Sequence, residues 1–291
     1  MGNKKSFIEG KSDLIDIEKA FFDKSPILYK FIPKFIFSKL KKIIHQQELN
    51  KIINTYREKK GLDFSNCGLN HMGVKTKSIG TDNIPKTGGV IVVANHPLGG
   101  LDGVAIINEV GKIRTDVHIL VNDILLQIEN FKPIFVPINK HGKNSRTNLS
   151  QIDNLYKSNK CIILFPAGMV SRRQKHKKIA DFEWKKSFIT KAINYKKNIV
   201  PVFISGKNSK RFYNIAYWRK KIGIKANIEM LFLADEMFKQ KGNTITFNFG
   251  KQISWQTFTS STNKLSWAQR VKNHVYQLEH NQNALFEDTY K

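Results

Sequence analysis

A histidine and an aspartate stand six positions apart in the sequence, on either side of a pair of glycines. The stretch reads Asn95-His96-Pro97-Leu98-Gly99-Gly100-Leu101-Asp102. Imidazole has a pKa near neutrality, so His96 is suited to take a proton as a general base. Asp102 would accept the other ring N–H, fix the tautomer and stabilise the imidazolium. The pair predicts acid–base catalysis, with His96 as the base and Asp102 as its orienting partner.

The neighbouring residues indicate how this pair would be positioned. Residues 90–94 form a short apolar run rich in β-branched residues, which is typical of a buried strand. Gly99 and Gly100 indicate a positive φ or the close approach of another molecule, and Pro97 stiffens the turn. Asp102 has a second interpretation, as the N-cap of a helix that follows it, and it could fill both roles.

Strand-like and helix-like segments alternate after residue 88. Strands are expected at residues 90–94, 117–121, 134–138, 161–165, 199–204 and 245–249. Helices are expected at residues 103–110, 148–157, 184–196 and 266–279. The alternation predicts an α/β fold with a mostly parallel central sheet flanked by helices. Residues 61–88 are interpreted as loop-like, because glycine and proline recur through them.

A basic amphipathic segment precedes this domain. Between residues 20 and 44 aromatic and aliphatic residues alternate with lysine, and Pro33 starts or kinks a helix that continues to about Glu58. This pattern is typical of a helix that lies in a membrane interface, although an ordinary helix packed on the core is the alternative. We therefore divide the chain into a membrane-interfacial segment, residues 1–60, and a catalytic domain, residues 61–291. Residues 209–221, also basic and aromatic, are a second candidate for the membrane surface.

The net charge of +26 indicates which kinds of partner the protein could bind, but it says nothing about the fold. An anionic membrane, nucleic acid and acidic substrates are all compatible with it, and so is a composition biased towards Lys, Asn and Ile. No apolar run approaches the roughly 18 residues of a membrane span, and no signal peptide is recognisable. We expect a peripheral protein on the cytoplasmic face of the plasma membrane. Cys67, Cys161 and the histidines match no metal spacing, so no metal site is expected.

Unusual residues follow three further expected strands: Lys140, the block Pro166-Ala167-Gly168-Met169-Val170-Ser171-Arg172-Arg173, and Ser205. Together with the His96 stretch, these segments resemble, in order and rough spacing, the four motif blocks of the glycerolipid (lysophospholipid) acyltransferase superfamily. That superfamily has a His-x4-Asp catalytic block and a Phe-Pro-Glu-Gly-Thr-Arg-Ser-Arg acceptor-binding block. The resemblance implies a glycerol-3-phosphate acyltransferase-like fold. Within the superfamily the chain looks most like the hemolysin-like branch, which is similar to ornithine and glycine aminolipid O-acyltransferases.

The chain departs from the superfamily pattern in two ways. Five residues rather than four separate His96 from Asp102, so the glycine pair must absorb one extra residue. In the acceptor block, Ala167 replaces the Glu and Val170 replaces an Arg, whereas Ser171 and Arg172 match. The resemblance implies that the missing Glu and Arg hold a phosphorylated acceptor. Their loss favours a lyso-aminolipid, whose headgroup carboxylate an arginine or lysine would bind.

The resemblance implies acyl transfer from acyl-ACP or acyl-CoA, as co-substrate with no bound cofactor, to the hydroxyl of a lyso-lipid. Backbone N–H groups near Gly99-Gly100 or Gly168 are the candidate donors to the oxyanion. The expected substrate-binding residues are Asn95, Gly99, Gly100, Lys140, Pro166, Gly168, Ser171, Arg172 and Arg173. Two alternatives stay open, namely a 1-acylglycerol-3-phosphate acyltransferase and, from another class, a basic nucleic-acid-binding protein. The second lacks any recognised nucleic-acid motif, so no nucleic acid is expected as a partner. A membrane-perturbing activity would be a side effect of altered lipids.

Overall fold

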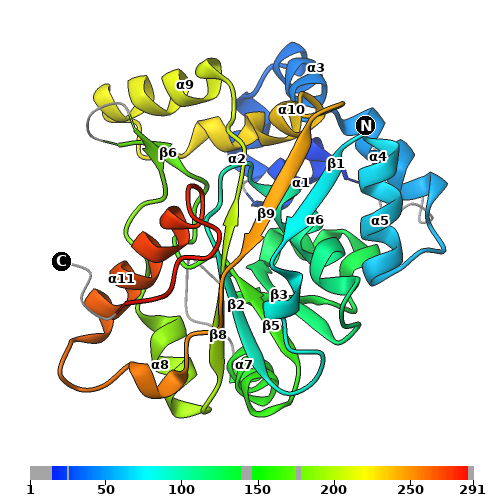
Figure 1. The fold of residues 1–291 in the computed structure, drawn as a ribbon. Coiled ribbons are helices and arrows are strands. Elements are labelled where there is room, and N and C mark those ends of the chain that lie inside the picture. The colour runs from blue at the N-terminus through cyan, green and yellow to red at the C-terminus, as the bar shows by residue number, and fades with distance from the viewer. Residues whose placement is uncertain (1–14, 25, 139–145, 175–177, 288–291) are drawn as a thin grey trace.

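The computed structural model describes residues 15–24, 26–138, 146–174 and 178–287. Its centre is a seven-stranded sheet in the order β1-β9-β8-β2-β5-β3-β4 (Figure 1). The strands are β1 (Lys75–Ile79), β2 (Val90–Ala94), β3 (Val117–Asn122), β4 (Phe135–Ile138), β5 (Cys161–Leu164), β8 (Asn198–Ile204) and β9 (Thr244–Phe249). Strands β4, β3, β5, β2 and β8 are parallel, whereas β9 is antiparallel to β8 and pairs in parallel with β1. The predicted α/β fold with a mostly parallel sheet is confirmed.

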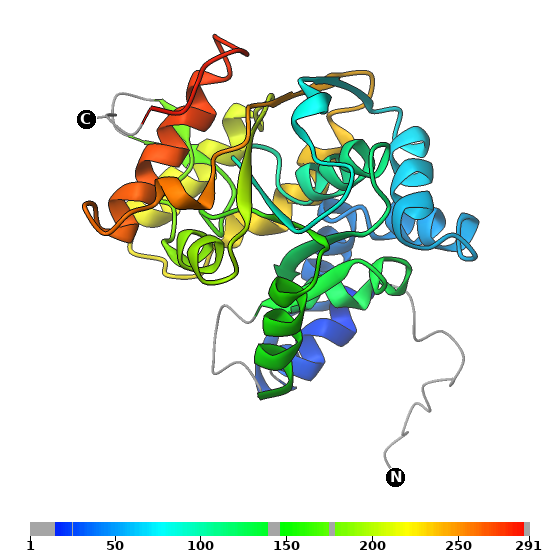
Figure 2. The ribbon, with the colours of Figure 1, turned by 60° about the horizontal axis from the view of Figure 1, so that its bottom comes forward.

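Strand β2 is at the centre of this sheet and is buried on both faces. Val90, Val92 and Ala94 pack against α5 (Gly61–His71) and α6 (Gly100–Gly111). Ile91 and Val93 point to the opposite face of the sheet. That second face is covered by α7 (Arg146–Lys157), α8 (Ser187–Asn194) and α11 (Lys264–Gln277). Figures 1 and 2 show these helices on opposite sides of the sheet. A strand buried on both faces explains the unbroken β-branched run of β2.

The stretch expected to be loop-like contains a helix and a strand, so that prediction was wrong. Gly61 starts α5 with a φ of +54°, and Gly68 lies inside the same helix. Strand β1 is polar and lies at the sheet edge beside β9. Its Thr76 and Ser78 hydroxyls donate to the carboxylate of Glu109 on α6, each at 2.6 Å. Tertiary contacts therefore stabilise α5 and β1, although the glycine content of the first and the polarity of the second are typical of a loop.

Within the described part of the N-terminal segment, from residue 15, lie four short helices: α1 (Ile17–Lys24), α2 (Pro26–Phe31), α3 (Lys34–Ile43) and α4 (Gln46–Thr55). As expected, the helix after Pro33 begins at Lys34, but it does not continue to Glu58, because His45 adopts a left-handed conformation with φ of +49°. His45 then contacts the domain: its Nε2 lies 3.1 Å from Asp235, and its ring stacks on Phe238. Within the described residues no helix is both long and apolar enough to cross a bilayer.

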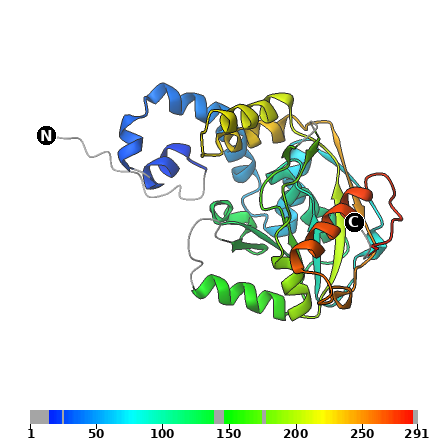
Figure 3. The ribbon, with the colours of Figure 1, turned by 90° about the vertical axis from the view of Figure 1, so that its left-hand side faces the viewer.

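A helical layer covers the carboxyl end of β8. It consists of α9 (Lys210–Lys221), the 3-10 helix η5 (Ile228–Phe232) and α10 (Leu233–Phe238). Ser209 caps α9 by accepting from the amide of Phe212, and Glu236 on α10 accepts from the Ser209 hydroxyl at 2.7 Å. In Figures 1 and 3 this layer lies at the same end of the molecule as α3. The carboxyl ends of β2, β5 and β8 thus meet beneath it, at the edge where sites of parallel sheets form.

Candidate active site at the carboxyl ends of the parallel strands

His96 follows β2 after one intervening residue, Asn95, and pairs with Asp102. Its Nδ1 lies 3.0 Å from Asp102 Oδ2, and 17% of its side chain is exposed. The ring stacks on Phe165, which follows β5, with centroids 4.0 Å apart. A neutral ring that donates from Nδ1 keeps Nε2 unprotonated. The geometry therefore suits Nε2 to accept a proton.

Asp102 is wholly buried at the third position of α6. Its Oδ2 accepts from the amides of Leu98 and Gly99, at 2.8 and 3.1 Å, as well as from His96. Burial raises the pKa of Asp102, while these hydrogen bonds act in the opposite direction. The helix begins at Gly100 and its N-cap is Gly99, so the expectation that Asp102 is the N-cap was wrong. Asp102 lies inside the first turn, where it accepts from the Gly99 amide and contacts the imidazole.

Gly99 lets the turn take up the extra residue between His96 and Asp102. Its φ is +83° and its ψ is −133°, a combination open essentially to glycine alone. A Cβ atom at this position would lie 3.0 Å from Leu233 on α10. Close approach and unusual dihedrals therefore both require glycine, as the sequence indicated.

Asn95, expected to bind substrate, instead connects two strands. Its side chain is buried, donates to the carbonyl of Ile204 at 2.9 Å and accepts from the amide of Ile204 at 2.7 Å. These bonds join the end of β2 to the end of β8. Both polar atoms of the Asn95 side chain thus have partners in β8, which fixes the backbone next to His96.

Asp181 holds the histidine turn against the Pro166–Arg173 block, and the sequence analysis missed it. Its Oδ1 accepts from the His96 amide at 3.1 Å and from the Ser171 hydroxyl at 2.5 Å, and its Oδ2 accepts from the Trp184 indole at 2.9 Å. The Ser171 amide also donates to the His96 carbonyl at 2.7 Å. Ser171 is thus a buried positioning residue. Asp181 and Glu183 both lie between Lys178 and Lys185, so the sequence alone carries no signal that singles out Asp181.

Arg172, expected to bind substrate, is buried and paired within the protein. Its guanidinium is buried, pairs with the wholly buried Glu229 at 3.0 Å and stacks over Phe212 at 4.6 Å. Glu229 also accepts from Arg219 on α9 at 2.5 Å. The cluster joins the Pro166–Arg173 block to the helical layer. A carboxylate ligand would have to displace Glu229 from this buried ion pair, so we interpret Arg172 as a structural residue.

The remaining candidates have different surroundings. Arg173 is partly exposed and donates to Asn214 at 3.0 Å. The amide of Gly168 donates to Phe165, and Pro166 accepts from the amide of Lys185. Lys140 lies outside the described residues. Gly100 is exposed at the start of α6, where helix amides lack an intrahelical acceptor. In the parts of the chain that the structure describes, no group of three or more His, Cys, Asp and Glu is placed to hold a metal ion.

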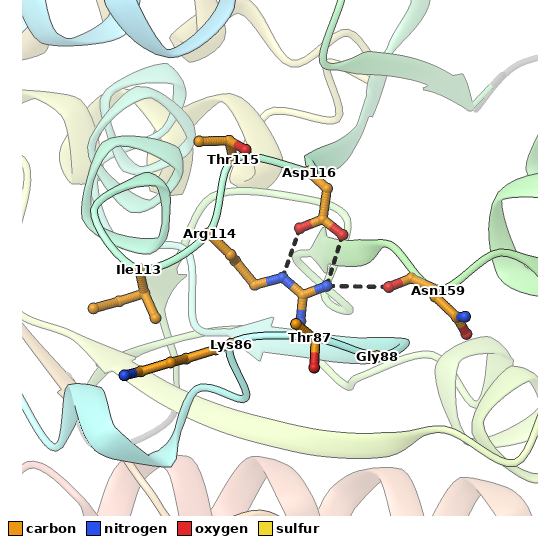
Figure 4. A pocket seen from close by; sticks show the side chains of 8 residues that line it. All are labelled: Lys86, Thr87, Gly88, Ile113, Arg114, Thr115, Asp116 and Asn159. Atoms are coloured by element: carbon orange, nitrogen blue, oxygen red, sulfur yellow. Dashed lines mark hydrogen bonds and ion pairs between the residues drawn. The ribbon is translucent and has the colours of Figure 1, made fainter.

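A hollow of about 510 Å³ lies at the opposite edge of the sheet (Figure 4). Its Gly88, Asp116 and Asn159 precede β2, β3 and β5, so the parallel strands place it away from His96. Arg114 binds Asp116 through two hydrogen bonds of 2.7 Å and also donates to the Asn159 carbonyl. This arginine holds together the loops at the amino ends of the strands.

Comparison with known proteins identifies the class to which this site belongs. The model of an acyltransferase family matches residues 19–284, and the chain belongs to that family. It is 46% identical over 266 residues to a lyso-glycine lipid O-acyltransferase of Bacteroides thetaiotaomicron, covering 91% of this chain and 97% of the relative. A protein of the same name from Phocaeicola vulgatus is 44% identical, with 91% and 95% coverage. The chain is an acyltransferase, and the resemblance to the superfamily is confirmed.

Among solved structures, the chain is similar to the 1-acyl-sn-glycerophosphate (LPA) acyltransferase PlsC from Thermotoga maritima. The TM-score is 0.46 and the identity 17%, with 91% of this chain and 92% of that chain covered.

Proposed function

We propose that this acyltransferase moves a fatty acyl group from a thioester, acyl-ACP or acyl-CoA, to the hydroxyl of a lyso-aminolipid of the glycine type. The observation that carries the proposal is the His96–Asp102 pair at 3.0 Å, in a chain 46% identical to a lyso-glycine lipid O-acyltransferase. An alcohol is a poor nucleophile until a base takes its proton, and this pair supplies such a base.

In this mechanism His96 Nε2 accepts the proton of the acceptor hydroxyl while the oxygen attacks the thioester carbonyl. Asp102 keeps the proton on Nδ1 and stabilises the imidazolium. The tetrahedral oxyanion then collapses, the C–S bond breaks, and the departing thiolate receives the proton from His96. Of the proposed glycine donors, the amides of Gly99 and Gly168 already donate to Asp102 and Phe165. We therefore assign oxyanion stabilisation to the Gly100 amide at the helix start.

The acceptor headgroup is assigned to the surface beside the Pro166–Arg173 block. With Arg172 paired to Glu229, Arg173 and Lys140 are the cations proposed to bind a headgroup carboxylate. Val170 is buried against Phe212 and Tyr213, where the superfamily pattern has an arginine. The apolar replacement supports an acceptor without a phosphate and disfavours a 1-acylglycerol-3-phosphate.

The N-terminal segment, residues 1–60, is proposed to bind an anionic membrane at its cytoplasmic face. Phe31 and Phe35 are 79% and 61% exposed, and Lys39 lies over the Phe35 ring. Exposed phenylalanines beside lysines fit an interfacial helix better than a helix packed on the core. The segment precedes the proposed catalytic domain, residues 61–291.

The test is an acyl-transfer assay with purified protein. Each donor, acyl-ACP and acyl-CoA, is offered with lyso-glycine lipid, lyso-ornithine lipid and 1-acylglycerol-3-phosphate. We expect transfer to lyso-glycine lipid, lost by a factor of about 10²–10⁴ in His96→Ala. His280→Ala, at a histidine 82% exposed, is the matched control and keeps wild-type activity.

Equal activity of His96→Ala and wild type would refute the base assignment. Preference for 1-acylglycerol-3-phosphate would support the alternative acceptor. Salt-sensitive nucleic-acid binding without acyl transfer would favour the other class of function.

A further inference from the structure

The outward side of α9 and the adjoining η5 segment carries large apolar side chains. Trp218 is 55% exposed and Ile222 68%, the highest fraction among the large apolar residues from α9 to η5. We define the α9 face as Tyr217, Trp218, Ile222, Ile224, Ile228 and Met230, each at least 38% exposed. Trp218, Ile222, Ile224 and Ile228 also line a groove of about 570 Å³. An apolar surface of this kind on a folded domain marks a binding site.

The orientation of α9 is determined by its inner side. Phe212 and Tyr213 are buried against Val170, and the Arg172 guanidinium stacks on Phe212. Arg219 binds Glu229 through Nε and Nη2, at 2.5 and 3.0 Å. These contacts leave the α9 face directed outwards.

Positive charge surrounds the α9 face. The sequence contains no Asp or Glu from Trp184 to Ile228, and Glu229 is wholly buried. The exposed cations on and around the helix are Lys207, Lys210, Arg211, Lys220, Lys221 and Lys225. Lys221 also lies 4.9 Å from the centre of the Trp218 ring. A tryptophan and a tyrosine among isoleucines, ringed by lysines, match the headgroup region of an anionic bilayer.

The α9 face lies on the same side of the molecule as the N-terminal helices. Helix α3 contacts η5, and Figures 1 and 3 both show α3 and α9 at one end of the sheet. The catalytic turn is directly beneath, because Leu233 on α10 packs against Gly99. A membrane that contacted α3 and α9 together would lie over the edge of the sheet that carries His96.

We propose that the α9 face is a second membrane-binding surface, which inserts Trp218 and Ile222 into the headgroup region of an anionic bilayer. This inference rests on the proposed function, since it concerns how a lipid acceptor reaches His96. Two contacts, at α3 and α9, would orient the domain with its catalytic edge towards the lipid. An apolar centre fits a bilayer better than an acidic carrier protein, for which the surrounding lysines alone would suffice.

The test uses the full chain and sedimentation with vesicles of phosphatidylcholine, with and without phosphatidylglycerol. Trp218→Ala combined with Ile222→Ala is expected to weaken binding to the anionic vesicles by about tenfold or more. Leu149→Ala combined with Leu265→Ala, which removes exposed leucines from α7 and α11, is the matched control and leaves binding unchanged. Lys220→Gln with Lys221→Gln is expected to weaken binding about fivefold for each lysine at low salt, and less at high salt.

A second measurement separates this inference from the proposed function. With detergent-dispersed lyso-glycine lipid, the Trp218/Ile222 variant is expected to keep wild-type activity, which also shows that it folds. With acceptor in vesicles its KM rises at unchanged kcat. Vesicle binding of the Trp218/Ile222 variant equal to that of wild type would overturn the inference. If the variant in addition used acyl-ACP less well, the α9 face would be assigned to the carrier protein instead. If wild type transfers no acyl group but the variant still loses vesicle binding, the proposed function fails and the membrane surface stands.

Discussion

The loops after β2 and β5 begin at the same edge of the sheet, and both match motif blocks of one superfamily, yet they use their charged residues differently. After β2, the buried Asp102 orients a histidine that remains partly exposed. After β5, Arg172 is itself buried and is neutralised by Glu229. In the proposed mechanism the first loop carries the base, whereas the second loop is tied into the fold by its ion pair. A motif position therefore indicates where a residue lies but not whether it contacts a substrate.

The largest expected effect concerns the histidine loop. In Asp102→Asn the amide no longer enforces the tautomer with Nδ1 protonated, so kcat is expected to fall by about 10²–10⁴. Steady-state acyl-transfer kinetics measure this effect, and a circular dichroism melt confirms folding. A loss of less than tenfold would mean that His96 works without an orienting carboxylate.

Arg172→Met should act on stability instead. Removal of Arg172 leaves the buried Glu229 with Arg219 as its main cation, so we expect a loss of about 3 kcal/mol in the free energy of unfolding. Urea denaturation measures it, while kcat and KM of the folded fraction stay close to wild type. An unchanged stability with a raised acceptor KM would return Arg172 to the substrate site.

Gly99→Ala tests the point at which the helical layer contacts the catalytic turn. Its backbone conformation and the 3.0 Å approach to Leu233 predict a cost of about 1–3 kcal/mol and a roughly tenfold lower kcat. Gly68→Ala is the control, because Gly68 is helical with open space around its Cβ position. Differential scanning calorimetry with kinetics would separate the two effects. Wild-type behaviour of Gly99→Ala would show that the turn is not constrained by α10.

The smallest expected effect belongs to Arg173, next to Arg172 in sequence. Arg173→Gln is expected to raise the KM for lyso-glycine lipid about fivefold to tenfold at unchanged stability, through loss of a charge-assisted contact to the headgroup. The exposed Lys185→Gln serves as its control. An unaltered KM would leave Lys140 as the proposed headgroup ligand.

Local patterns were sufficient for the parts of the site that depend on nearby residues. The β-branched run before His96 predicted β2 with its bounds, because a strand that is buried on both faces is apolar at every position. The glycine pair predicted a special turn, and Gly99 has the positive φ that this requires. His96 and Asp102 are near each other in sequence, and they meet as predicted because Gly99 absorbs the residue by which their spacing exceeds the superfamily pattern.

Contacts between distant segments were not predictable in the same way. The polar strand β1 is stabilised by β9, whose residues follow far later in the chain, and its own sequence resembles a loop. Asp181 has no spacing relation to His96, although it holds the His96 backbone from 85 positions away. A polar segment reveals its structure only when its hydrogen-bond partners are known.

By itself, the sequence determined the class of fold, the membership in an acyltransferase family and the catalytic histidine turn as a proposal. Burial periodicity and local turn chemistry specify these features. Only the tertiary structure decided that Asn95 hydrogen-bonds Ile204 and that Arg172 forms an ion pair with Glu229. It alone also decided that Trp218 on α9 is exposed. A buried polar group takes whichever partner the packed chain brings to it, and that choice is made between segments that lie far apart in the sequence.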